Sequence, residues 1–261
     1  MTGLIRSEWR KVTTTRMLLG LTLGGLALVA FYVAVIVFTA GSDQAGSNAL
    51  RSLADPGSVR AVYGVPFEVG YLMPLVLGVV LISGEFRHRT ITPTFLAAPR
   101  RSRVLIAKAI VAGGVGLGMG FLLTAFAAGL GAILIAARGY PVRIGTDGIP
   151  RMLALMVVGL GVWAVFGLGF GALLKNQVAA ILVALALVTI VEGLLALFLR
   201  WAHLDWVAEV LPSTASMAIV QPSNVKAADL LPWWGGGLAL LAWGLVTAAL
   251  GSVFTLRRDV T

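Results

Sequence analysis

The sequence predicts an all-α integral membrane protein with six transmembrane helices. Of its 261 residues, 59% are hydrophobic and 12% are charged, whereas about 25% of the residues of an average soluble domain are charged. A soluble fold of this length cannot hide so much apolar surface, so lipid has to form part of its solvent. The apolar runs are continuous rather than alternating, which favours helices over a β-barrel.

Uncharged runs locate the six spans. Such runs fill the intervals between Arg16 and Asp43, Lys108 and Arg138, Arg151 and Lys175, and Asp229 and Arg257, with 26, 29, 23 and 27 residues. Two further apolar runs contain one acid each, Glu68 and Glu192. A bilayer core of ~30 Å requires about 20 helical residues, so every run is long enough. The predicted spans, which form a single transmembrane domain over residues 1–261, are 17–40, 62–84, 105–136, 152–174, 178–199 and 232–256.

The distribution of basic residues predicts the orientation. With both termini inside, the cytoplasmic segments hold 13 Lys or Arg residues and three acids, and the outer loops hold seven basic residues and six acids. The positive-inside rule therefore places both termini in the cytoplasm. The Arg-rich and Ala/Gly/Val-rich usage is typical of a high-GC bacterium, so we expect a multi-pass protein of the bacterial plasma membrane.

The first 16 residues predict a helix in the inner membrane interface. Leu4, Ile5, Trp9 and Val12 fall near one side of such a helix, and basic residues occupy the rest of its circumference. The apolar side would face the lipid and the basic side the anionic headgroups. The alternative is a frayed basic tail that only determines topology.

Several kinds of chemistry are excluded by the residues present. The chain has no cysteine, and its two histidines, His88 and His203, are predicted on opposite sides of the membrane. The glycine clusters at 113–120 and 167–171 are not followed by the Lys-Ser/Thr of a phosphate loop. Their small-xxx-small spacing instead predicts close helix packing. We therefore expect no enzyme activity, no bound cofactor and no nucleic acid partner.

The segment GEFRHRTITPTFLAAPRRSRVLIAK, residues 84–108, gathers positive charge between two apolar spans. Residues 90–97 are long enough for two turns of helix, and Pro99 would end it. We expect Lys108 to snorkel back to the inner surface from the start of span three. A short helix with apolar side chains, held parallel to the membrane, can enter a groove of a partner protein. The alternative is a basic loop that only follows the positive-inside rule.

The connection before the sixth span, residues 200–234, also predicts short helices. Apolar residues recur at helical spacing between Trp201 and Leu211, which indicates an amphipathic helix in the outer interface. Four tryptophans, at positions 201, 206, 233 and 234, suit the aromatic belt of a membrane protein.

In motif and layout the chain resembles the membrane subunits of type-2, exporter-type ATP-binding cassette transporters. The family has an acid after span two, a short apolar helix, a Pro-Arg-like break and a Lys that opens span three. Arg89 stands where glycine is common in the family. The positions that match or belong to the expected ATPase-coupling segment are Glu85, Arg87, Arg89, Thr90, Ile91, Phe95, Leu96, Pro99 and Arg100, with Lys108 opening span three.

The resemblance implies a transport subunit built from two six-span halves, the second being a copy of this chain or a paralogue. A separate cytoplasmic ATPase subunit would carry ATP and Mg, and the region before span six would cap the exit. Spans two and five would line the path, which makes Glu68 and Glu192 candidate path-lining residues. Alternatively, each of these two acids pairs within its own bundle with Arg60, Arg200 or an outer-loop group. The apolar path suggests a lipophilic or amphiphilic substrate for export.

Two other functions fit the same composition. One is the substrate-binding membrane subunit of a vitamin-uptake complex, which would need no basic coupling segment but would need a polar ligand pocket near the outer surface. The other is an immunity or sensor protein that keeps the permease layout without transport.

Overall fold

The computed structural model describes residues 1–41, 52–87, 101–174, 176–222 and 230–257. Within these ranges the chain is helical and contains no strand, which confirms the all-α prediction. The described residues include six helical segments long and apolar enough to cross a membrane. Each overlaps one of the six predicted spans, and together they make the chain a multi-pass membrane protein in its architecture.

The helices follow one another with few interruptions. Two π-helical segments, η2 and η3, divide the second and fifth spans. The elements are α1 (Thr2–Thr13), α2 (Arg16–Thr39), α3 (Pro56–Val65), η2 (Pro66–Gly70), α4 (Leu72–Arg87), α6 (Arg101–Ala137), α7 (Ile149–Leu173), α8 (Gln177–Ala186), η3 (Leu187–Val191), α9 (Glu192–Trp201), α10 (Asp205–Val210), α11 (Pro212–Val220) and α12 (Trp233–Arg257).

Local sequence signals explain where several of these helices begin. Asp55 caps α3 by accepting a hydrogen bond from the Gly57 amide, and Pro56 occupies the first helical position. Asn176 caps α8, where its side-chain oxygen accepts from the amides of Val178 and Ala179 at 2.9 and 3.2 Å. Both caps lie immediately before an apolar run, as N-terminal helix signals usually do.

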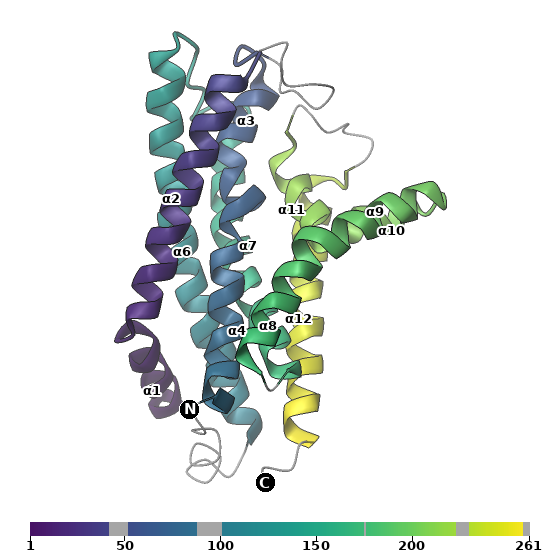
Figure 1. Cartoon of the computed structure of the whole chain (residues 1–261). Helices are drawn as coiled ribbons and strands as arrows, with labels where there is room; N and C mark the ends of the chain where they lie inside the picture. Colours follow the sequence, from purple (N-terminus) through teal and green to yellow (C-terminus); the bar gives the residue numbers. More distant parts are fainter. Residues whose placement is uncertain (42–51, 88–100, 175, 223–229, 258–261) are drawn as a thin grey trace.

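α7 lies at the centre of the bundle and packs against α4, α6 and α12 (Figure 1). Glycines permit the closest approaches. A Cβ atom at Gly167 or Gly171 would overlap the backbone carbonyls of Leu75 and Val79 on α4. On α6, Gly116 and Gly120 pack in the same way against α7, as their spacing predicts, whereas Gly118 has nothing within reach of a Cβ among the described residues.

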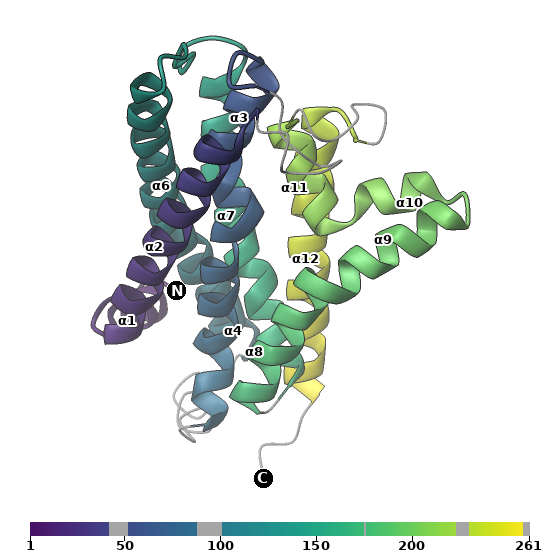
Figure 2. The same cartoon turned by 45° about the horizontal axis from the view of Figure 1, so that its top comes forward.

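The fifth span leaves the bundle as it proceeds. α8 packs against α4, whereas α9 and the following α10 extend away from the other helices (Figures 1 and 2). The span from Gln177 to Trp201 is accordingly the least buried of the six. One continuous helix over 201–211, as the periodicity indicates, does not form, because α9 ends at Trp201 and His203 has a left-handed backbone conformation.

α1 and the C-terminal end of α12 lie at the same end of the bundle (Figure 1). That end also contains the last turn of α4 and the first turn of α6. An even number of crossings places both ends of a chain on one side of the membrane, as the basic residues also predict. The residues that flank the 88–100 segment therefore lie close to the N-terminal helix.

Candidate functional site

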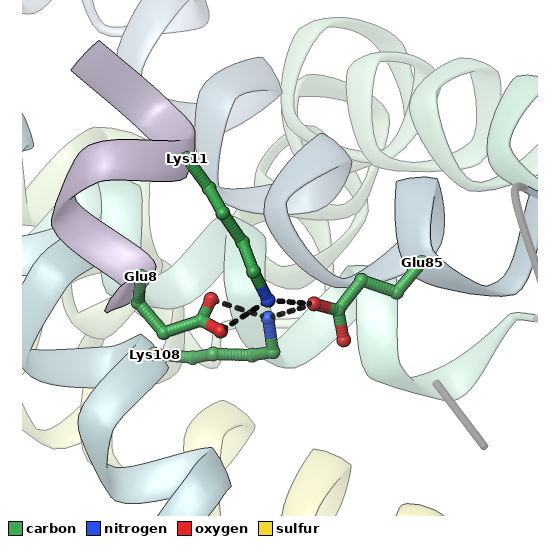
Figure 3. Close-up of polar contacts among 4 residues, drawn as sticks. All are labelled: Glu8, Lys11, Glu85 and Lys108. Atoms are coloured by element: carbon green, nitrogen blue, oxygen red, sulfur yellow. Dashed lines mark hydrogen bonds and ion pairs between the residues drawn. The ribbon is translucent and has the colours of Figure 1, made fainter. Parts of the chain in front are cut away.

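Four charged side chains meet where α1 contacts the bundle (Figure 3). α1 contributes Glu8 and Lys11, α4 contributes Glu85 and α6 contributes Lys108. The four residues are hereafter the four-charge cluster. Residues 85 and 108 flank the basic segment of the sequence, so the cluster joins the N-terminal helix to both sides of that segment.

Each amine in the cluster contacts both carboxylates. Lys108 Nζ lies 2.6 Å from Glu8 Oε2 and 2.8 Å from Glu85 Oε1. Lys11 Nζ lies 2.6 Å from Glu8 Oε1 and 2.9 Å from Glu85 Oε1. Two positive and two negative charges alternate around this arrangement, so it carries no net charge. Such charge-assisted bonds are among the strongest polar contacts in proteins.

The members of the cluster differ in their exposure to solvent. The side chain of Lys108 is 2% exposed, and those of Glu8 and Glu85 are 5% and 9% exposed. The side chain of Lys11, in contrast, is 47% exposed. Lys108 is therefore the buried cation that compensates two buried carboxylates, while Lys11 contacts the same carboxylates from the solvent-exposed side of the cluster.

The electrostatics of Glu8 and Lys11 follow from these contacts. Burial on its own raises the pKa of Glu8, but the charges of Lys108 and Lys11 and their hydrogen bonds outweigh it and hold that pKa below its usual value. Burial on its own lowers the pKa of Lys11, but hydrogen bonds to Glu8 and Glu85 outweigh it and raise that pKa. Both groups are therefore held in their charged forms.

One atom of the cluster lacks a partner among the described residues. The Oε2 atom of Glu85 is buried and accepts no hydrogen bond there, whereas Oε1 accepts from both lysines. The cluster offers no nucleophile, and its carboxylates are already occupied by amines. Its ion pairs join three helices, α1, α4 and α6.

The structure revises one expectation about this region. Lys108 does not snorkel to the surface, because two acids neutralise it inside the bundle. Among the described residues, the partners of Glu85 are the basic side chains of Lys11 and Lys108.

Only two of the predicted coupling residues lie within the described ranges. Glu85 belongs to the four-charge cluster, and Arg87 is exposed at the end of α4, where its Nη1 atom lies 3.5 Å from Gln177 Oε1. The remaining predicted coupling residues, which lie outside the described residues, are Arg89, Thr90, Ile91, Phe95, Leu96, Pro99 and Arg100.

The two intramembrane acids have different surroundings. Glu68 lies within η2 and is exposed, and its side chain has no hydrogen bond or ion pair with any described residue. Glu192, directly after η3, is buried and accepts hydrogen bonds from the Ser213 amide and from Ser213 Oγ, the latter at 2.9 Å. Glu192 therefore bonds to the outer connection, which is one of the alternatives left open by the sequence.

Two apolar grooves lie between α6, α7 and α12, with volumes of about 320 and 240 Å³. Neither groove is lined by Glu68 or Glu192. Small and aliphatic side chains line both of them, and Ser102 in the larger groove is the one polar side chain among the lining residues. The grooves therefore offer few polar groups that could orient a hydrophilic ligand.

Sequence reasoning missed Glu8 as a site residue, although a signal was present. Glu8 is the first acid of the chain and stands alone among the basic residues of an interfacial helix. Lys108 is similarly isolated at the start of a long apolar run. Comparison of the sequence with protein-family models and with curated proteins finds no match.

Proposed function

We propose that this chain is the transmembrane subunit of an ATP-binding cassette export complex. Its substrate would be lipophilic or amphiphilic, and a separate cytoplasmic subunit would hydrolyse the ATP. The complex would contain a second permease half, and both termini and the 88–100 segment would face the cytoplasm. The resemblance in the sequence and the geometry of the four-charge cluster both support this function.

The four-charge cluster is the observation that carries the proposal. A subunit driven by an external ATPase needs a rigid connection between the docking segment and the spans that move. The cluster supplies one, since it fixes the last turn of α4 and the start of α6 to the same helix, α1. A displacement of the segment between α4 and α6 would therefore be passed to all three helices together.

Glu68 is the candidate path-lining acid that the surroundings favour. Its carboxylate is exposed within a π-helical segment of span two, and π-helical turns occur frequently at functional sites. An uncompensated acid in a span is costly unless it faces water, protein or a cation. Facing the path between two halves would provide such surroundings and would favour cationic amphiphiles as substrates.

The test begins with a search of the neighbouring reading frames for an ATP-binding cassette ATPase, followed by reconstitution of this chain with that ATPase. We expect the two proteins to co-purify and ATP hydrolysis to drive amphiphile export from inside-out vesicles. Phe95→Ala combined with Leu96→Ala should release the ATPase or uncouple its turnover, because apolar interface anchors typically contribute ~2 kcal/mol or more each. Arg101→Gln serves as the control and should leave both properties nearly unchanged.

A chain that neither retains such an ATPase nor supports ATP-driven export would contradict the proposal. Equal losses in the double alanine variant and in Arg101→Gln would indicate an electrostatic tether instead of a seated helix. Retention of ATPase binding with loss of export only in the double alanine variant would support the coupling role directly.

A further inference from the structure

The short helix α11 is bound at both of its ends by charged side chains from different spans. Its N-terminus faces Glu192, which begins α9, and its C-terminus faces Arg60 of α3. α11 comprises the nine residues Pro212–Val220, and most of its side chains are buried. No pattern in the sequence indicates that these two charges act on the same element.

The N-terminal contact matches the chemistry of a helix start. The first turn of any helix has amide groups without an intrahelical acceptor and a partial positive charge. The two oxygens of Glu192 accept from the amide and the hydroxyl of Ser213, the second residue of α11. Glu192 thus acts as a cap supplied by another span.

The C-terminal contact has the opposite polarity. Arg60 Nε donates to the carbonyl of Val220 at 3.0 Å, and its Nη2 atom donates to Gln221 Oε1 at 3.3 Å. Gln221 has a left-handed conformation, with φ 51°, which ends the helix. A cation therefore neutralises the negative end of α11 just as an anion neutralises its positive end.

The sides of α11 are also closely packed. A Cβ atom at Gly64 of α3 would overlap Val220, and one at Gly236 of α12 would overlap the carbonyl oxygen of Ala215. Beneath the helix, Trp163 of α7 donates from its indole nitrogen to Ser216 Oγ at 3.2 Å. α11 therefore fits between spans two, four and six, and Glu192 links it to span five.

We propose that Glu192 and Arg60 are positioning residues that clamp α11 in a closed position across the outer part of the bundle. The clamp is released only when spans five and two change their separation, because each span holds one end of the same short helix. Glu192 is accordingly a gate residue and not a ligand for cargo. The effect on export rests on the proposed function, whereas the clamp itself does not.

A cysteine pair measures the position of α11 directly. A Cβ at Gly64 would lie 3.4 Å from Val220 Cβ, close to the ~3.5–4.5 Å typical of disulfides. The chain contains no other cysteine, so Gly64→Cys with Val220→Cys gives one possible intramolecular bond. In the purified full chain, mild oxidation should cross-link this pair efficiently.

Loss of either charge should loosen the clamp. Adding Glu192→Gln or Arg60→Gln to the cysteine pair should lower the rate of cross-linking about threefold or more, as expected for a charge removed from a helix terminus. Ser213→Ala keeps the carboxylate and should have a smaller effect. Glu209→Gln and Arg200→Gln are the matched controls, because neither side chain has a hydrogen bond or ion pair with any described residue.

Export provides the second readout. Oxidation of the cysteine pair should stop export while the ATPase stays bound, and a reductant should restore export. Unchanged cross-linking in both Glu192→Gln and Arg60→Gln, or equal changes in the controls, would overturn the clamp. Continued export with α11 cross-linked would overturn its role as a gate. Failure of the ATPase to bind would refute the proposed function, and the cross-linking rates would still decide the clamp.

Discussion

The four-charge cluster and the α11 clamp use charged residues in different ways. In the cluster, next to α1, four fully charged side chains contact one another. In the clamp, Glu192 and Arg60 each contact one end of the helix α11. In the four-charge cluster, each carboxylate faces two amines at 2.6–2.9 Å. In the α11 clamp, each side chain faces one backbone group and one neutral side-chain group, which carry only partial charge. The four-charge cluster is therefore suited to hold its three helices together permanently. The weaker contacts at the ends of α11 are suited to break and form again.

Burial sharpens this difference. Three members of the four-charge cluster are almost fully buried, and removing any one of them would leave an uncompensated charge inside the bundle. In the clamp, Glu192 is buried but Arg60 is only half-buried. We therefore expect substitutions in the cluster to affect folding and substitutions in the clamp to affect motion.

The largest expected effect follows from Lys108→Met. This variant removes the buried cation and leaves Glu8 and Glu85 with Lys11 as their shared cation, so the free energy of unfolding should fall by about 3 kcal/mol or more. Thermal unfolding in detergent measures the change. Lys11→Met is the matched control and should cost clearly less, because that side chain is 47% exposed.

Combining Lys108→Met with Glu8→Gln tests whether the two residues act as a unit. The double variant should be less destabilised than the sum of the two single variants, since it removes one charge of each sign. Strict additivity would mean that the cluster is a set of independent contacts. In that case the contrast with the α11 clamp would not hold.

How well the sequence predicts these two regions depends on the range of the interactions. The six spans are predictable because a charged residue inside the bilayer is costly, so uncharged runs of sufficient length mark them. α10 and α11 lie in the connection where short helices are expected. The break at 202–204 is not predictable from periodicity, because Trp201 and Leu204 continue the apolar pattern through it.

The partners of the charged residues could not be predicted. Glu8 and Lys108 are 100 positions apart, and Arg60 and Val220 are 160 apart. Basic residues near spans are normally solvated or in contact with headgroups, and nothing local distinguishes Lys108 from those. The π-helical segments were also missed, although Pro66 lacks the amide that a regular α-helical bond would need. η2 contains Glu68, and η3 immediately precedes Glu192.

A pH titration gives an effect of intermediate size at the four-charge cluster. The pKa of Glu8 is lower in the folded chain than in the unfolded chain, so its stabilising contribution is present above the unfolded pKa of about 4.5. That contribution should be lost as the pH falls through the folded pKa. The pKa of Lys11 is raised, so its contribution is lost only as the pH rises above about 10.5 and through its folded pKa.

Thermal unfolding of the native chain and of Glu8→Gln across this range measures the contribution. The native chain should lose stability below pH 4.5 more steeply than Glu8→Gln, and the two should behave alike near neutral pH apart from a constant offset. Parallel curves at acidic pH would show that Glu8 is not held in its charged form by the cluster.

The smallest effect is expected at Arg87, two residues beyond Glu85 on the same helix. Arg87 is exposed, and its contact with Gln177 is 3.5 Å long, whereas Glu85 is buried and bonds to two lysines. Arg87→Gln should therefore change the free energy of unfolding by less than about 0.5 kcal/mol, as is usual for exposed polar contacts. Glu85→Gln removes a charge that two buried or half-buried amines share, and should lower the free energy of unfolding several times more.

Equal effects of Arg87→Gln and Glu85→Gln on thermal unfolding would show that position along α4, and not membership of the four-charge cluster, determines their importance. Because both residues flank the same basic segment, this pair is the most direct test of whether a joint exists at that end of the bundle.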